Sequence, residues 1–230
     1  TGVQTCALPI LQHSLDAHGI SVSGAAIDVA KMIARKDAIV AKMTGGIEML
    51  FRKNKITWLK GHGSFVGGKE GAWRIAISGD GTQETVEATN VIVATGSTAR
   101  HLPGVPVDNE VVCDNVGALA FKNVPTRLGI IGAGVIGLEL GSVWRRLGAK
   151  VTILEALPTF LGAADESVSR EAWKLLTREQ GLDIQLGVKI GKIDVAASPG
   201  AVRIAYEHDG AEKHRSEEHT SELQSHHDLV

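Results

Sequence analysis

The sequence predicts an α/β fold in two parts: a partial domain with one long helix and antiparallel strands, then a doubly wound domain built on a parallel sheet. The first observation is the stretch from Leu128 to Glu155, where an apolar run, a glycine turn, a helical pattern and a β-branched run follow one another. The second is a change from helical spacing over residues 25–53 to alternating spacing over residues 56–94. With 230 residues, 43% of them hydrophobic, the chain can bury a core in one or two domains.

The glycine turn has the residue types that a dinucleotide-binding turn requires. Gly132 allows the tight turn, Gly134 lets a pyrophosphate approach the backbone, and Gly137 lets the helix pack close to the strand. The phosphates would then face free N–H groups at a helix N-terminus, where the partial positive charge favours anions. A glycine pattern alone is weak, and the alternative is a βαβ unit that binds no nucleotide. Here a strand precedes the glycines, a helix follows them, and an acid ends the next strand at the expected spacing. This order favours a Rossmann-type unit.

Glu155 ends the second strand of this unit, where a carboxylate can accept hydrogen bonds from both ribose hydroxyls of the adenosine. The same charge repels a 2′-phosphate. No arginine occurs in the five residues that follow, 156–160. The sequence therefore predicts NAD rather than NADP.

Composition excludes several classes of function. A formal charge of −2 gives no support for binding nucleic acid, and no apolar run approaches the length that spans a membrane. The two cysteines, Cys6 and Cys113, have no metal-ligand or redox-motif spacing, which indicates a reducing compartment such as the cytoplasm. We interpret Cys113 as a packing residue and expect no metal site, although three histidines near the C-terminus allow one in principle: His219, His226 and His227.

The other elements are predicted from periodicity and from glycine or proline interruptions. Residues 100–127 contain three prolines and are predicted to link the two domains. The helix over 166–180 is expected to end at Gly181 and to bury Val168, Ala172, Leu175 and Leu176. Strands are predicted at 56–59, 72–77, 86–94, 183–190 and 202–206, with turns at 67–68 and 79–81.

The two ends match none of these elements. Residues 1–10 and 215–230 resemble translated sequencing-adapter text, so we expect neither end to be native. The polar composition of residues 215–230 predicts a disordered tail or a frayed helix. The predicted domains therefore cover residues 11–120 and, for the NAD-binding domain, residues 121–214.

Four stretches carry a resemblance to a known family: residues 53–63, 91–97, 102–104 and 132–144. Taken together they closely resemble the dihydrolipoamide (dihydrolipoyl) dehydrogenase family of the pyridine-nucleotide disulfide oxidoreductases, and the resemblance runs from about Leu11 to His214. In that family reduced lipoamide opens a redox disulfide, a thiolate passes electrons to FAD, and reduced flavin sends hydride to NAD. The resemblance also implies a homodimer and a partner lipoyl domain of a 2-oxo acid dehydrogenase or glycine-cleavage complex, with a mitochondrial location if the source is eukaryotic.

The resemblance also implies which residues bind the cofactors. For NAD, Ile136 and Glu139 would lie near the nicotinamide, Glu155 would hold the adenosine ribose, and Ile190 would pack by the adenine. The residues alone equally allow an exposed charge at Glu139 and core packing at Ile136 and Ile190. The full sets are Gly63, Thr95, Gly96 and Ser97 for FAD, and Gly132, Ala133, Gly134, Val135, Ile136, Gly137, Leu138, Glu139, Glu155 and Ile190 for NAD.

The family's FAD glycine motif, its C-x-x-x-x-C pair, its His–Glu pair and its dimerisation domain do not occur in this sequence. We therefore interpret the chain as an internal fragment, in which the resemblance implies a partial FAD domain over 11–120 and an incomplete NAD domain over 121–214. We assign no catalytic residue and predict no lipoamide turnover by the chain alone. Two alternatives stay open. One is another disulfide reductase, of the mercuric, glutathione or transhydrogenase type, and the other is a non-catalytic NAD-binding redox module.

Overall fold

The computed structural model describes residues 26–79, 81–198, 201–217 and 219–222. Residues 37–98 form one compact unit, and the described residues before 37 and after 98 form the other. The long helix α2 (Val29–Lys53) contributes to both, since its first residues belong to the second of these units. The predicted boundary between FAD and NAD domains near residue 120 stays a prediction.

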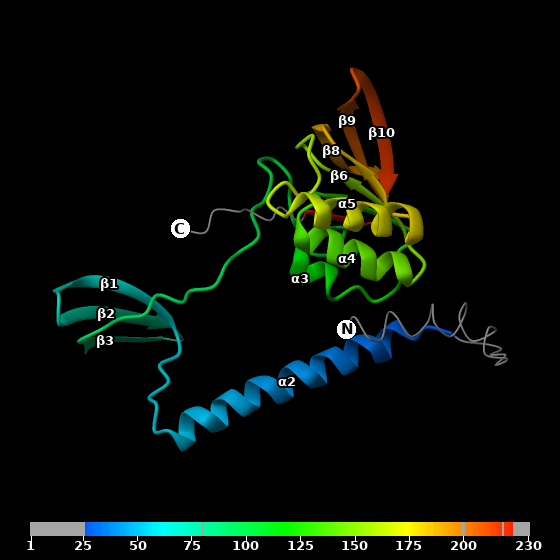
Figure 1. The fold of residues 1–230 in the computed structure, drawn as a ribbon. Helices are drawn as coiled ribbons and strands as arrows, with labels where there is room; N and C mark the ends of the chain where they lie inside the picture. The colour runs from blue at the N-terminus through cyan, green and yellow to red at the C-terminus, as the bar shows by residue number, and fades with distance from the viewer. Residues whose placement is uncertain (1–25, 80, 199–200, 218, 223–230) are drawn as a thin grey trace. The chain divides into compact units, whose positions relative to one another are not determined.

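The unit of residues 37–98 contains a three-stranded antiparallel sheet in the order β1-β2-β3 (Figure 1). Its strands are β1 (His62–Lys69), β2 (Ala72–Gly79) and β3 (Thr82–Ala88). The prediction of a strand at 56–59 and a turn at 67–68 is wrong, because Gly67 lies at a bulge inside β1 and the hairpin turns at Glu70 and Gly71.

The strand predicted at 86–94 ends at Ala88, so residues 91–94 form no strand. Ile92 is 90% exposed, and none of the described strands pairs with this segment. The helical spacing of α2 is confirmed, and apolar side chains that carry this spacing are exposed: Ile39, Val40, Met43, Ile47 and Leu50. The helical spacing therefore predicted the helix but not which of its side chains are buried.

The other unit contains a parallel sheet, confirming the predicted α/β class. Among the described residues its order is β4-β11-β5-β6-β7, and every neighbouring pair is parallel. In β5 and β6, all residues after the first are buried. A parallel sheet covered on both faces explains why these strands are continuous apolar runs. The strands are β4 (Val112–Cys113), β5 (Arg127–Ile131), β6 (Lys150–Leu154), β7 (Asp183–Gln185) and β11 (His219–Glu222).

Helices cover one face of this sheet. The core between these helices and the sheet includes Leu128, Ile130, Ile153 and Trp144, and Val29 of α2 also packs in it. The predicted helix at 166–180 is confirmed, but its buried side is shifted: Val168 is 57% exposed, whereas Trp173 packs on the core. The helices are α3 (Asn115–Ala118), α4 (Val135–Arg146) and α5 (Glu166–Lys174), which continues as the π-helical turn η2 (Leu175–Glu179).

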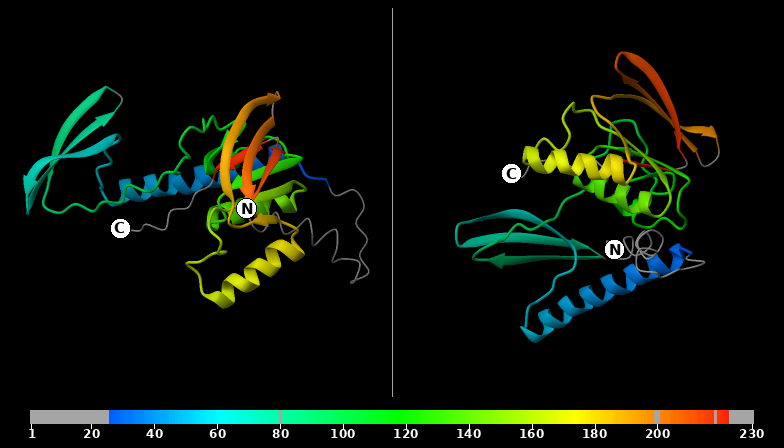
Figure 2. Two further views of the ribbon diagram at one scale, coloured as in Figure 1. Left: turned by 90° about the horizontal axis from the view of Figure 1, so that it is seen from above. Right: turned by 45° about the vertical axis from the view of Figure 1, so that its right-hand side comes forward.

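The opposite face is covered by an antiparallel sheet in the order β10-β9-β8 (Figures 1 and 2). Leu154 and Val112 of the parallel sheet share a core with Val202, Ile204 and Tyr206 of this antiparallel sheet. The predicted disordered tail is wrong for Arg215–Glu217 and for His219–Glu222, which end β10 and form β11. The strands are β8 (Lys189–Ser198), β9 (Ala201–His208) and β10 (Ala211–Glu217).

Candidate functional site

The glycine turn between β5 and α4 has the geometry that its sequence predicts. Gly132 adopts φ +103, in the region that L side chains rarely occupy, and its N–H donates to the carbonyl of Leu154 at 2.8 Å. A Cβ on Gly137 would lie 2.3 Å from the Gly132 carbonyl oxygen. Strand β5 and helix α4 therefore approach as closely as they do because both positions are glycine.

Helix α4 begins without a side-chain cap. Its N-cap residue is Gly134, and the first hydrogen bond into the helix runs from the N–H of Leu138 to the carbonyl of Gly134 at 3.0 Å. The N–H groups of Val135, Ile136 and Gly137 precede that bond and have no acceptor inside the helix. This end of α4 therefore offers an anion both N–H donors and the positive end of the helix dipole.

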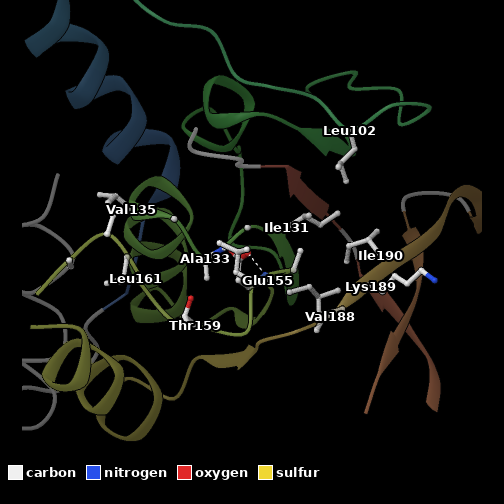
Figure 3. Close-up of a pocket in the computed structure, with 18 residues that line it drawn as sticks. Leu102, Ile131, Ala133, Val135, Glu155, Thr159, Leu161, Val188, Lys189 and Ile190 are labelled. Carbon is white, nitrogen blue, oxygen red and sulfur yellow. Dashed lines mark hydrogen bonds between the residues drawn. The ribbon is translucent and has the colours of Figure 1, made fainter. Parts of the chain in front are cut away.

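Glu155 faces the glycine turn directly. It follows the last residue of β6, and its carboxylate accepts hydrogen bonds from the N–H of Ala133 at 2.6 Å and of Leu157 at 2.8 Å. The close-up in Figure 3 shows Glu155 beside Ala133, on the side of the glycine turn that faces Val188. The predicted acid thus lies next to the predicted turn.

The turn and the acid line one cavity of about 870 Å³, within the size range of small-molecule sites (Figure 3). It lies beyond the carboxyl ends of β5 and β6, where open α/β sheets bind their ligands. Further walls come from Leu102, from the last residues of β5 and β6 (Ile131 and Leu154), from the loop after β6, and from residues 188–190 at the beginning of β8.

Six of the ten residues predicted for NAD meet at this cavity. They are Gly132, Ala133, Gly134, Val135, Glu155 and Ile190.

The other four do not line it. Gly137 and Leu138 are buried at the helix–sheet contact, and Ile136 is 40% exposed, which excludes the core alternative for that residue. Glu139 is exposed and, with Leu138, lines a separate hollow of about 540 Å³ on the flank of α4. Whether these four contact a nucleotide stays a prediction.

The residues predicted for FAD lie in the unit of residues 37–98. Gly63 is in β1, opposite Ile77, and the segment that contains Thr95, Gly96 and Ser97 has no regular structure. Gly96 adopts φ +74, so the glycine there meets a backbone requirement. No described contact joins Gly63 to this segment, and the FAD assignments stay predictions.

Sequence reasoning missed the longest wall of the cavity, the loop of residues 156–164. The ring of Phe160 in this loop meets the ring of Trp173 edge-on, with 5.1 Å between the ring centroids. The carbonyl of Leu161 accepts a hydrogen bond from the hydroxyl of Ser169 at 3.1 Å. Its place after the second strand of the glycine unit was a usable signal, since ligands bind at that edge of the sheet. Leu102 and Lys189 carried no such signal, because they reach the cavity from distant segments.

Cys113 has the surroundings of a packing residue, as predicted. Its side chain is fully buried in the helix-side core, and burial, with the carboxylates of Asp108 and Asp114, raises the pKa of its thiol to about 12. A thiol with that pKa is not a thiolate at neutral pH. Cys6 lies outside the described residues.

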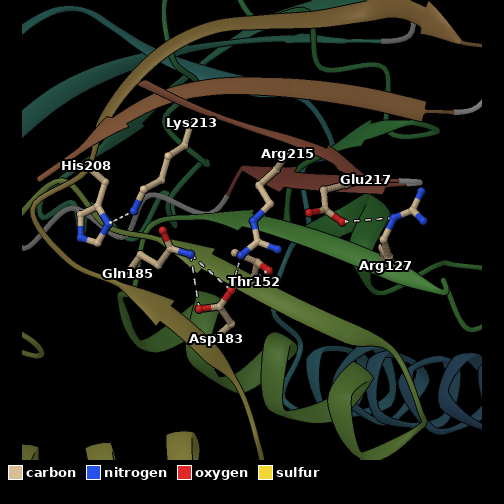
Figure 4. A network of polar contacts seen from close by, with 8 residues as sticks. All are labelled: Arg127, Thr152, Asp183, Gln185, His208, Lys213, Arg215 and Glu217. Atoms are coloured by element: carbon tan, nitrogen blue, oxygen red, sulfur yellow. Dashed lines mark hydrogen bonds and ion pairs between the residues drawn. The ribbon is translucent and has the colours of Figure 1, made fainter. Parts of the chain in front are cut away.

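A second group of polar contacts lies at the junction of β10 with the parallel sheet (Figure 4). Arg215 donates to Asp183 at 2.7 Å, and the hydroxyl of Thr152 lies 3.3 Å from the same carboxylate oxygen. Arg127 lies 3.8 Å from Glu217, which is buried. Arg215 with Asp183 and Arg127 with Glu217 pair opposite charges, so we interpret this group as one that joins β10 to β5 and β7.

The described residues contain no group of three or more side chains suited to a metal ion. The predicted histidine alternative includes His226 and His227, which lie outside them. None of the described helices is long and apolar enough to cross a membrane.

The chain is similar in sequence to one family of known proteins. The family model described as "Pyridine nucleotide-disulphide oxidoreductase" matches residues 5–216. A dihydrolipoyl dehydrogenase of Cupriavidus necator is 61% identical over 80% of this chain and 38% of its own length. Dihydrolipoyl dehydrogenase 3 of Pseudomonas aeruginosa is 47% identical over 79% of this chain and 37% of its own length.

Among solved structures, LpdA from Mycobacterium tuberculosis has the same fold, with a TM-score of 0.80 at 20% identity. That match covers 96% of this chain and 46% of LpdA. The chain spans less than two fifths of the length of the two curated relatives.

Proposed function

The chain belongs to the pyridine nucleotide-disulphide oxidoreductase family, and from that premise we propose that it carries the NAD-binding part of a dihydrolipoyl dehydrogenase. The parent reaction is oxidation of protein-bound dihydrolipoamide by NAD, through FAD and a redox disulfide. The two dihydrolipoyl dehydrogenases that resemble the chain support this substrate class.

The described residues fit one part of this reaction, the holding of NAD. The N–H groups at the start of α4, from Val135 to Gly137, would hold the diphosphate. Glu155 would accept hydrogen bonds from the ribose hydroxyls of the adenosine, and Val188 and Ile190, which line the cavity, would pack against the adenine. NAD, when bound, supplies the nicotinamide that accepts a hydride; the chain's own residues orient it.

The observation that carries the proposal is the position of the Glu155 carboxylate, 2.6 Å from the N–H of Ala133 in the glycine turn. One cavity thus presents an anion-binding helix end and, beside it, a fixed acceptor for a sugar. The carboxylate also disfavours a 2′-phosphate by charge repulsion, which separates NAD from NADP.

The remaining roles belong to the parent protein. We place FAD with Gly63, Thr95, Gly96 and Ser97, the lipoyl domain of a 2-oxo acid dehydrogenase or glycine-cleavage complex as partner, and a homodimer as the assembly. The parent is cytoplasmic, or mitochondrial in a eukaryote. This chain should not turn over lipoamide, because its two cysteines, Cys6 and Cys113, do not have the C-x-x-x-x-C spacing of the family's redox pair.

The alternatives predict different ligands. An NADP-dependent disulfide reductase needs cations for the 2′-phosphate, and residues 156–160 provide none. A non-catalytic NAD-binding module binds NAD but needs no flavin. Retention of FAD by the full chain would therefore argue against the module, and tighter binding of NADPH than of NADH would favour the reductase.

The test is calorimetric titration of the full chain with NADH and with NADPH. We expect NADH to bind at least about tenfold more tightly, the size of one strong charge interaction. Glu179→Gln is a control, because it removes a carboxylate from η2, outside the cavity. It should leave the ratio of the NADH and NADPH dissociation constants unchanged. Tighter binding of NADPH, or no binding of NADH, would contradict the proposal.

A further inference from the structure

Glu155 contacts the backbone of two segments that line the cavity. The Glu155 bridge, as we call it, consists of the hydrogen bonds that its carboxylate accepts from the N–H groups of Ala133 and Leu157. It joins the turn after β5 to the loop after β6. Resting on the proposed function, we infer that Glu155 is a positioning residue for the diphosphate-binding turn as well as the acceptor for the ribose.

The turn needs such a constraint because glycine-rich backbone is conformationally free. Its first N–H, that of Gly132, is already held by the carbonyl of Leu154 at 2.8 Å. Its second N–H, that of Ala133, is held by Glu155, and Ala133 is only 4% exposed. Two consecutive residues at the end of β6 thus fix two consecutive amides of the turn, and these set where α4 starts.

This arrangement divides the amides between two roles. The N–H groups of Gly132 and Ala133 already donate to Leu154 and Glu155. The N–H groups left for an anion are therefore those at the start of α4. A carboxylate has about four acceptor positions, and the bridge uses two of them. Ribose hydroxyls can therefore donate to Glu155 without breaking the bridge.

The inference predicts a result opposite in sign to simple electrostatics. Inorganic pyrophosphate has no ribose, so a residue that only reads the sugar should not help to bind it. Removing a nearby carboxylate should strengthen the binding of this anion by lowering charge repulsion. If Glu155 positions the turn, its removal should weaken the binding of pyrophosphate.

The experiment compares the full chain with its Glu155→Ala, Glu155→Gln and Glu179→Gln variants, titrated with inorganic pyrophosphate. We expect Glu155→Ala to weaken binding about tenfold, the scale of one charge-assisted hydrogen bond. Glu155→Gln should weaken it less, because its carbonyl can still accept one of the two N–H groups, and the control should not change. Unchanged or tighter binding in Glu155→Ala would overturn the inference.

A second readout needs no ligand. Hydrogen exchange at the Ala133 amide should be slow in the unmodified chain and markedly faster in Glu155→Ala, with Glu155→Gln between them. Equal exchange in all three would also overturn the inference. If the unmodified chain fails to bind NADH, the proposed function fails instead, and the exchange measurement still decides the role of Glu155.

Discussion

At Gly137 the structure leaves no room for a side chain. A Cβ there would lie 2.3 Å from the carbonyl oxygen of Gly132, which is backbone and cannot rotate away. We expect Gly137→Ala to lower the free energy of unfolding by roughly 1–3 kcal/mol, as overpacking does, and to weaken NADH binding because the turn must move. Chemical denaturation and titration measure the two effects.

The control for this prediction is Gly45→Ala in α2, where nothing lies within 4 Å of the added Cβ. That substitution should stabilise its helix by about 0.5–1 kcal/mol, since alanine is the better helix former. Equal tolerance of both substitutions would show that β5 and α4 are not in the close contact described.

Cys113 predicts a dependence of stability on pH. Its thiol has a pKa raised to about 12 by burial, from an ordinary value of 9.0, so the folded state binds the proton more tightly than the unfolded state. The resulting stabilisation is complete below pH 9 and is lost as pH rises through the folded pKa, at about 1.4 kcal/mol per unit.

The measurement is denaturation near pH 8 and pH 10 of two chains that both carry Cys6→Ser, with and without Cys113→Ala. The advantage of the chain that keeps Cys113 should shrink by roughly 1 kcal/mol at the higher pH. A constant difference, or reaction of Cys113 with a thiol reagent in the native chain, would contradict its burial.

Residues whose role depends on local backbone were predictable from sequence. Gly132 and Gly137 were found because a positive φ and a close approach each require glycine, and Glu155 was found from its place at a strand end. Leu102 was not found, because its place in the cavity depends on how distant segments fold together. The second role of Glu155 was also not predictable, since hydrogen bonds to Ala133 and Leu157 are not visible in a pattern.

Among elements, helices were predicted better than strands. The helices α2 and α5 with η2 follow the predicted periodicity, and η2 ends at Glu179, near the predicted stop at Gly181. A strand also needs a partner, and residues 56–59 and 91–94 have the composition of strands without pairing to any described strand. The prediction failed at these segments because pairing is not a local property.

The contact between α3 and α4 gives a prediction at this scale. Trp144, 2% exposed, donates from Nε1 to the carbonyl of Ala118 at 3.1 Å and lies against Phe121. Trp144→Phe removes this buried donor and some volume, and should lower the free energy of unfolding by about 1–3 kcal/mol.

Trp58→Phe serves as the control, because Trp58 is 48% exposed and phenylalanine can keep its ring contact with Phe51. It should change stability by less than half as much in the same denaturation experiment. A larger loss in Trp58→Phe would contradict the burial that the structure assigns to the two tryptophans.

For the whole molecule, the sequence predicted the α/β class and the glycine unit but not the arrangement of strands. β11 lies between β4 and β5, although its residues, 219–222, follow β5 by almost ninety positions and read as a polar tail. The antiparallel sheet β8–β10 covers the second face of the parallel sheet through long-range packing of Val202 and Ile204. Such non-local pairing leaves no local signature.

The central claim is that one cavity, between the glycine turn and Glu155, holds NAD. The most direct test is to record the backbone amide spectrum of the ¹⁵N-labelled full chain with and without NADH. We predict that the largest changes fall on residues 132–137, on Glu155 and on Val188–Ile190, with α5 and β1–β3 unchanged. Changes centred on β1–β3, or none in the glycine turn, would contradict the claim.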